Sequence, residues 1–134
     1  MEILIVTASA AIEMNSLHFL SSTLYRALTD IAPRDAIARG YVVGPRMFVA
    51  GAYVTITGGA GAMTGSAPDI QLPWDLHYGE ANSPWEVRQR IRRLANDGAD
   101  HIKVLSSGAV LTHGSNPKSQ EFTPDELQAA VAAS

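Results

Sequence analysis

The feature that most constrains the fold is a lysine inside a short apolar segment. Residues 98–108 predict a glycine that ends a helix, an apolar strand with Lys103 at its centre, and a polar loop. Burying an ammonium group costs several kcal/mol unless it is paired, neutralised or chemically altered. Strand alternation gives two faces, formed by His101, Lys103 and Leu105 and by Ile102 and Val104. We therefore expect the Lys103 amine to enter a confined polar space near the strand end, the alternative being a side chain that reaches solvent.

Helices are expected before and after this strand. Ser83, Pro84 and Glu86 form a strong helix start. The helix is expected to end at Gly98 and to bury one stripe, formed by Val87, Ile91, Leu94 and Ala95, while its arginines form a solvated face. A second capping box at residues 123–126 predicts a C-terminal helix, and residues 31–39 predict another that ends at Gly40. Helix, tight turn and strand in succession indicate an α/β fold.

The N-terminal third is expected to hold one strand and one helix. Residues 1–7 are rich in β-branched and aliphatic side chains, which favours a short buried strand. A helix is predicted from Asn15 or Ser16 to about Thr29, because leucines recur at spacings of three and four, at Leu17, Leu20, Leu24 and Leu28. His18 is expected to be a packed or surface residue and not a ligand. Residues 47–50 predict a buried strand that Arg46 anchors at its start.

Residues 58–65 form a glycine-rich exit from an extended segment. Such a segment permits positive φ and close backbone approach to a ligand. A phosphate cradle would lead directly into a helix, whereas a proline-bearing stretch follows here, so nucleotide binding is not favoured. The long irregular stretch 66–82 carries Trp74, His77 and Tyr78. These suit the rim of an apolar substrate pocket or, alternatively, a loop held to the surface by its own tryptophan.

Composition limits the classes of function. The 134 residues, 46% hydrophobic and 17% charged, predict a globular chain, and a formal charge of -3 gives no case for nucleic acid or anionic membrane as partner. The sequence has no cysteine, which excludes thiolate metal sites. No run is long enough to span a bilayer, and the Met1-Glu2 start lacks the positive charge of a signal peptide. A cytoplasmic location is the default expectation.

Several of these motifs together resemble the metal-dependent amidohydrolase superfamily. The segments that carry this resemblance are Arg34-Asp35-Ala36-Ile37-Ala38-Arg39-Gly40 with Gly44-Pro45-Arg46, Gly98-Ala99-Asp100-His101-Ile102-Lys103-Val104, and Phe122-Thr123-Pro124-Asp125-Glu126-Leu127. They are similar to the branch that contains imidazolonepropionase-like enzymes, Xaa-Pro dipeptidases and ochratoxin-type amidohydrolases. The resemblance covers residues 34–134, and residues 1–33 do not match it. It implies a (β/α)8 TIM barrel, for which 134 residues are too few, since a whole barrel needs roughly 200.

The resemblance also implies a site. The lysine matching Lys103 is carboxylated in that branch and bridges two zinc ions, and the substrate is a small amide or dipeptide-like molecule. His113, Gly58, Gly59, His77 and Tyr78 are candidate substrate-binding residues, whereas His101, deeper on the strand, is expected to be structural. Ala60 stands where the family commonly has a histidine.

Most of the family's metal ligands have no counterpart in this sequence. The His-x-His pair, the later histidines and the catalytic aspartate are lacking, so we assign no catalytic residue. The chain thus resembles the middle of an enzyme, and we expect it to associate with itself or to need the remainder of the barrel. The alternative is a non-catalytic α/β binding or structural module in which Lys103 is an ordinary amine.

Overall fold

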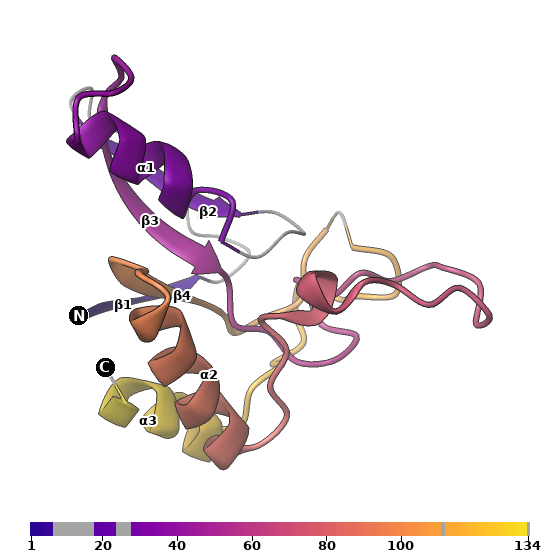
Figure 1. The fold of residues 1–134 in the computed structure, drawn as a ribbon. Coiled ribbons are helices and arrows are strands. Elements are labelled where there is room, and N and C mark those ends of the chain that lie inside the picture. Colours follow the sequence, from indigo (N-terminus) through magenta and orange to yellow (C-terminus); the bar gives the residue numbers. More distant parts are fainter. Residues whose placement is uncertain (7–17, 24–27, 111, 134) are drawn as a thin grey trace.

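The computed structural model describes residues 1–6, 18–23, 28–110 and 112–133. These residues form parallel strands joined by helices (Figure 1), which confirms the α/β class. In chain order the elements are β1 (Glu2–Val6), β2 (His18–Thr23), α1 (Ile31–Ala38), β3 (Arg46–Ala52), the 3-10 helix η1 (Trp74–His77), α2 (Pro84–Asn96), β4 (His101–Leu105) and α3 (Pro124–Ala133). No helix in these ranges has the length and apolar character that crossing a bilayer requires.

The strands pair in parallel. β1 pairs with β4 from Glu2 opposite His101 to Val6 opposite Leu105, and β2 pairs with β3. The continuation of β3 joins the two ladders, because the Val54 N–H donates to the Lys103 carbonyl at 2.8 Å and the Leu105 N–H donates to the Val54 carbonyl at 2.9 Å. The spatial order is therefore β2, β3, β4, β1.

Three of these strands follow the connectivity of an α/β barrel. Helix α1 connects β2 to β3, and α2 connects β3 to β4, so each strand lies beside the next one in the chain. β1 breaks this order, because the first strand lies on the far side of β4. In a barrel of consecutive strands that side of β4 belongs to the strand that follows it in sequence.

The core lies between the β4 face and helices α2 and α3. Ile102 and Val104 are almost completely buried there. They pack with side chains from both helices and the segment before α3, namely Val87, Ile91, Leu94, Phe122 and Ala130. The predicted division of β4 into two faces is thus confirmed. Ala95, expected in the buried stripe of α2, is exposed, because it lies one position past Leu94 and rotates out of that stripe.

The N-terminal helix prediction is wrong. Residues 18–23 form strand β2, and Leu28 lies in a turn with φ of 64°. Ser21, Ser22 and Thr23 are weak helix formers, and pairing with β3 supplies the backbone hydrogen bonds that a helix would have made. The expected cap at Asn15 or Ser16 lies outside the described residues.

The start of β3 is less buried than its apolar sequence predicts. Val49 and Ala50 are completely buried, but Phe48 is 36% exposed and Met47 is partly buried. The Arg46 guanidinium, at the first position of the strand, lies 5.1 Å from the centroid of the Phe48 ring. Arg46 therefore covers an aromatic side chain at the start of the strand.

Helices α1 and α2 end in the same glycine motif. After α2, the Gly98 N–H donates to the Ala95 carbonyl at 3.2 Å and the Ala99 N–H donates to the Leu94 carbonyl at 3.0 Å. Gly98 has φ of 102°, and Gly40 after α1 has φ of 74°. The chain reverses at Gly98 and enters β4 at once, so this glycine sets where the lysine strand begins.

Replacing Gly98 should destabilise the fold. Gly98→Ala forces a side chain into the left-handed region, so the free energy of unfolding should fall by about 1 kcal/mol. Urea denaturation checks this value, with the exposed α3 substitution Gln128→Ala as a control that should change it by less than about 0.5 kcal/mol. Equal stability of the two variants would contradict the role given to Gly98.

Candidate functional site

The face of β4 opposite the core carries Lys103. His101, on the same face, is buried at 7% exposure, and Lys103 and Leu105 are partly buried. The Lys103 Nζ lies 5.9 Å from the centroid of the Tyr53 ring. Burial lowers the pKa of the Lys103 amine below its usual 10.5. The amine therefore lies in a partly desolvated place, which agrees with the expectation of a confined site.

Tyr53 and the glycine-rich segment close this face beside Lys103. A Cβ on Gly61 would lie 2.2 Å from Cε2 of Tyr53 and 2.9 Å from Cδ1 of Leu105, so only glycine fits there. The Gly61 N–H donates to the Thr55 hydroxyl at 3.2 Å. The glycine at position 61 thus allows the loop to lie directly on the strand face that carries the lysine.

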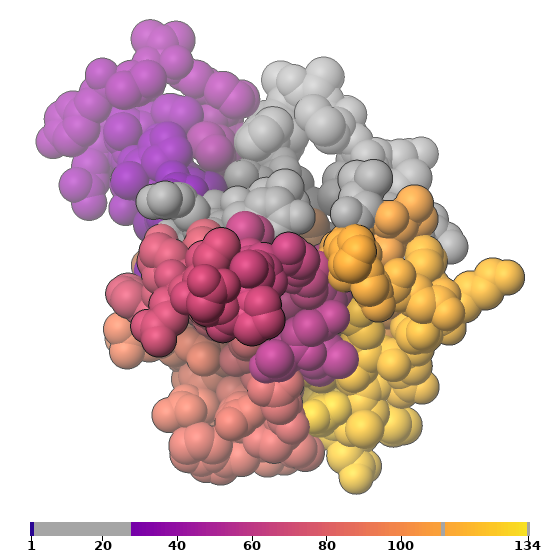
Figure 2. Space-filling view, turned by 90° about the vertical axis from the view of Figure 1, so that its right-hand side faces the viewer, coloured from indigo at the N-terminus to yellow at the C-terminus, as the bar shows by residue number. Residues whose placement is uncertain are grey.

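The predicted glycine loop lies against the loop that follows β4. The Thr112 hydroxyl donates to the Ala60 carbonyl at 2.7 Å, and the Thr64 hydroxyl donates to the His113 carbonyl at 2.9 Å. His113 itself is exposed. Figure 2 shows the orange segment after β4 beside the magenta segment that follows β3. Two strand-exit loops therefore meet at the carboxyl ends of β3 and β4.

Glu121 is the carboxylate that ties these loops together. Its Oε1 and Oε2 accept from the Ala60 N–H at 2.8 and 2.9 Å, and Oε1 accepts from the Ser115 hydroxyl at 3.3 Å. The sequence alone does not point to Glu121. It lies two residues before the α3 capping box, and no local pattern shows that it reaches residue 60.

Gly58 and Gly59 have different surroundings. Gly58 has φ of 73° and is exposed, and a Cβ there would have open space around it. Gly59 is buried, and a Cβ there would lie 2.6 Å from Oε2 of Glu121. The Ala60 N–H, which follows these glycines, already donates to the Glu121 carboxylate. No helix begins directly after this segment, and the next is η1 at Trp74, so it lacks the geometry of a phosphate loop.

In the aromatic cluster of the long loop, one ring is buried and another is exposed. Trp74 and Tyr78 have ring centroids 5.5 Å apart, but Trp74 is 71% exposed whereas Tyr78 is 4% exposed. The Tyr78 hydroxyl donates to Asp97 at the end of α2, and burial together with this hydrogen bond raises the pKa of Tyr78. Tyr78, and not the tryptophan, therefore holds the loop to the body of the protein.

His77 remains accessible next to Tyr78. Its side chain is 42% exposed, and its Nδ1 lies 2.6 Å from Oε1 of Glu80. Glu80 forms a parallel bridge with Thr55, whose neighbour Gly61 lies on the lysine face. His77 thus lies at the same end of the sheet as the two strand-exit loops.

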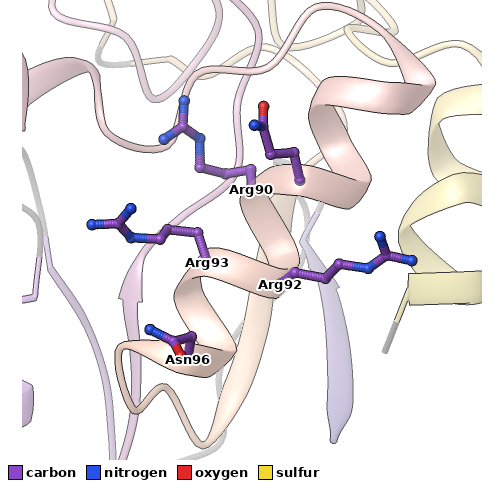
Figure 3. A pocket seen from close by; sticks show the side chains of 5 residues that line it. Arg90, Arg92, Arg93 and Asn96 are labelled. Atoms are coloured by element: carbon purple, nitrogen blue, oxygen red, sulfur yellow. The ribbon is translucent and has the colours of Figure 1, made fainter.

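The arginines of α2 do not converge on one point. Three of them, Arg90, Arg92 and Arg93, line a surface hollow with Gln89 and Asn96. Arg90 and Arg93 leave the helix on one side, and Arg92 leaves it on the opposite side, toward α3 (Figure 3). Arg93 pairs with Asp97 at 3.2 Å, and Arg90 donates to the Glu80 carbonyl at 3.2 Å. This agrees with the predicted solvated helix face.

The donor set does not fit a metal centre by itself. Among the described residues, no group of three or more His, Asp or Glu side chains is placed to hold a metal ion. Zinc needs about four ligands. Within that part of the chain Lys103 is the one candidate ligand that the sequence analysis named.

The pH dependence of stability should report the burial of Lys103. The unfolded chain binds more protons than the folded chain between the lowered folded pKa and 10.5. The free energy of unfolding should therefore rise as the pH increases toward 10.5, and Lys103→Met should abolish this rise. Measuring the free energy of unfolding at several pH values tests this prediction. The control Lys118→Met, at an exposed lysine, should retain the wild-type slope of free energy against pH. Identical slopes for wild type and Lys103→Met would refute the desolvation.

Removing the Glu121 carboxylate should separate the two loops. Glu121→Ala leaves the Ala60 N–H without its acceptor, so the free energy of unfolding should fall by about 1–3 kcal/mol. Hydrogen exchange at the Ala60 amide should become faster, and Glu121→Gln, which keeps one oxygen acceptor, should lie between. The exposed loop variant Asp69→Ala is the control. Unchanged exchange at Ala60 in Glu121→Ala would be inconsistent with the clamp.

Comparison with known proteins supplies the family. No protein-family profile matches the sequence. The chain is 33% identical over 109 residues to the ochratoxinase of Aspergillus niger, which covers 72% of this chain and 22% of that protein. The crystal structure of A. niger ochratoxinase is also similar in fold, with a TM-score of 0.67, 25% identity, and coverage of 87% of this chain and 29% of that one.

Two further solved structures agree. A Xaa-Pro dipeptidase with bound methionine matches with a TM-score of 0.78 and 26% identity over 98% of this chain and 39% of that one. An amidohydrolase matches with a TM-score of 0.67 and 28% identity over 85% of this chain and 29% of that one. The chain spans about a fifth of the length of its curated relative. In both sequence and fold the chain is therefore similar to a segment of larger amidohydrolase-superfamily enzymes.

Proposed function

We propose that this chain is part of a metal-dependent amidohydrolase that hydrolyses an amide or peptide-like C–N bond in a small substrate. The observation that carries the proposal is Lys103, an amine in a partly desolvated place on the inner face of a parallel strand. The relatives support it, since an ochratoxinase and a Xaa-Pro dipeptidase are similar in sequence or fold. By itself the chain is proposed to be inactive, because it carries only part of the site.

The environment of Lys103 favours carboxylation. A lowered pKa increases the fraction of neutral amine, and only the neutral amine attacks carbon dioxide. The nitrogen forms a bond to the carbon of CO2 and releases one proton, which leaves an anionic carbamate in place of a cation. A carbamate oxygen is a ligand type that zinc accepts, whereas an ammonium group is not.

The two zinc ions remain a proposal about the larger assembly. The described residues supply Lys103 alone, so the other ligands must come from outside them. The complete barrel is likewise part of the proposal. β2, β3 and β4 have the order of a (β/α)8 segment, and the remaining strands of a barrel, or a second copy of the chain, would complete that barrel. A cytoplasmic location stays a prediction.

Substrate contacts are assigned to the loops at the strand ends. Exposed His113 and His77 offer polar ring atoms, and Gly58 offers open backbone. Gly59 and Tyr78 are proposed to act from behind them, since both are buried. Barrel enzymes build their sites at this end of the strands, which supports the assignment.

Carbamate formation is measurable in the intact chain. After incubation with 13C-labelled bicarbonate, 13C NMR of the protein should show a carbamate resonance that Lys103→Arg abolishes. The sequence has one other lysine, Lys118, which is exposed, so Lys118→Arg is a matched control that should retain the resonance. The proposal fails if the two variants give the same spectrum.

Zinc content separates the hydrolase from the alternative module. With the missing part of the barrel or a native partner present, the protein should bind about two zinc ions, and Lys103→Ala should abolish this binding. A correctly folded, zinc-free assembly with an unmodified Lys103 would favour the non-catalytic α/β module.

A further inference from the structure

We infer that His77 and Glu80 form a ligand subsite that accepts a hydrogen bond from an N–H or O–H group of the substrate. The inference rests on the proposed function for the identity of the substrate as a small amide. It adds which end of that substrate the loop recognises and by which atom.

The pair is held rigidly. Oε1 of Glu80 lies 2.6 Å from Nδ1 of His77, and Oε2 accepts from the Thr57 hydroxyl at 3.0 Å. That hydroxyl accepts from Nδ2 of Asn82 at 2.9 Å, and Oδ1 of Asn82 accepts from the Thr57 N–H at 2.9 Å. The Glu80 side chain is 15% exposed. A network of this kind orients an imidazole as it does beside a metal or a reacting group.

These contacts fix which ring nitrogen carries the proton. A carboxylate oxygen only accepts hydrogen bonds, so Nδ1 of His77 is the donor to Glu80. In the neutral ring Nε2 then keeps its lone pair and is an acceptor. Because Nδ1 is engaged by the largely buried Glu80, Nε2 is the ring nitrogen that we assign to the ligand, on a side chain that is 42% exposed.

The pair lies on the lysine face, farther along the strands. Glu80 forms a parallel bridge with Thr55, which is two residues beyond Tyr53 and therefore on the same face. The Tyr53 ring lies beside Lys103. Two strand residues span roughly 7 Å. The subsite is thus displaced toward the carboxyl ends of the strands, and Glu80 lies on the side of the β3 continuation opposite the strand that carries Lys103.

The charges around the pair favour a donor over an anion. The acceptor Nε2 and the negative Glu80 behind it would repel a carboxylate. The Arg90 guanidinium donates to the Glu80 backbone carbonyl and lies over the Tyr78 ring, on the side of helix α2. It therefore balances Glu80 from behind and does not face the ligand.

Histidine-ring NMR of the 15N-labelled full chain tests the subsite. At about pH 8.5, Nε2 of His77 should have the shift of an unprotonated nitrogen. N-methylacetamide, which has an N–H, should shift this resonance several-fold more than N,N-dimethylacetamide, which lacks it, and acetate should give no more than the latter.

Variants assign the effect. His77→Phe identifies the resonance, and Glu80→Gln should mix the two tautomers and reduce the response to N-methylacetamide. An unprotonated Nδ1 in the wild-type protein, or equal shifts with both amides, would overturn the subsite. The readout needs neither zinc nor turnover, so a failure here is distinct from a failure to carboxylate Lys103.

Discussion

The partly desolvated amine of Lys103 is the constraint on which the rest of the structure depends. Its strand is buried on the opposite face by Ile102 and Val104, so the strand cannot rotate to give the lysine free access to solvent. On its own face, Tyr53 and the glycine loop narrow the space around it. A cation in such a place is costly unless it is paired and hydrogen-bonded or its charge changes. Conversion to an anion that binds metal would resolve the conflict between sequence and burial.

The surrounding loops are organised by three carboxylates, of which Glu121 and Asp97 lie far from their partners in sequence and Glu80 lies three residues from His77. Glu121 joins the loop after β4 to the glycine loop, Glu80 orients His77, and Asp97 holds Tyr78. Each of these groups accepts a hydrogen bond from a residue between β3 and α2. The polar network therefore adds to the attachment that core side chains such as Tyr78 give this stretch of chain.

Local patterns predicted the parts of the fold that local interactions determine. The Ser83 and Thr123 caps, the glycines after α1 and α2, and the two faces of β4 were all readable, because each depends on neighbours within a few residues. The resemblance indicated the family, which the comparisons confirm.

Long-range pairing was not readable. The leucine spacing up to Leu28 favoured a helix, but residues 18–23 form a strand that pairs with β3. Nothing in residues 1–7 indicates pairing with β4, and Glu121 has no motif that points to Ala60. For the candidate site, the sequence indicates the lysine and the loop histidines, which stay predictions, whereas the contact of Glu121 with Ala60 joins residues 61 positions apart.

The most direct measurement of the central claim is an electron-density map of the Lys103 side chain in crystals grown with bicarbonate. The account predicts planar density beyond Nζ for a carboxylate group, enclosed by Tyr53 and the glycine loop. A bare amine that extends into bulk solvent, with no space for an ion beside it, would contradict the account.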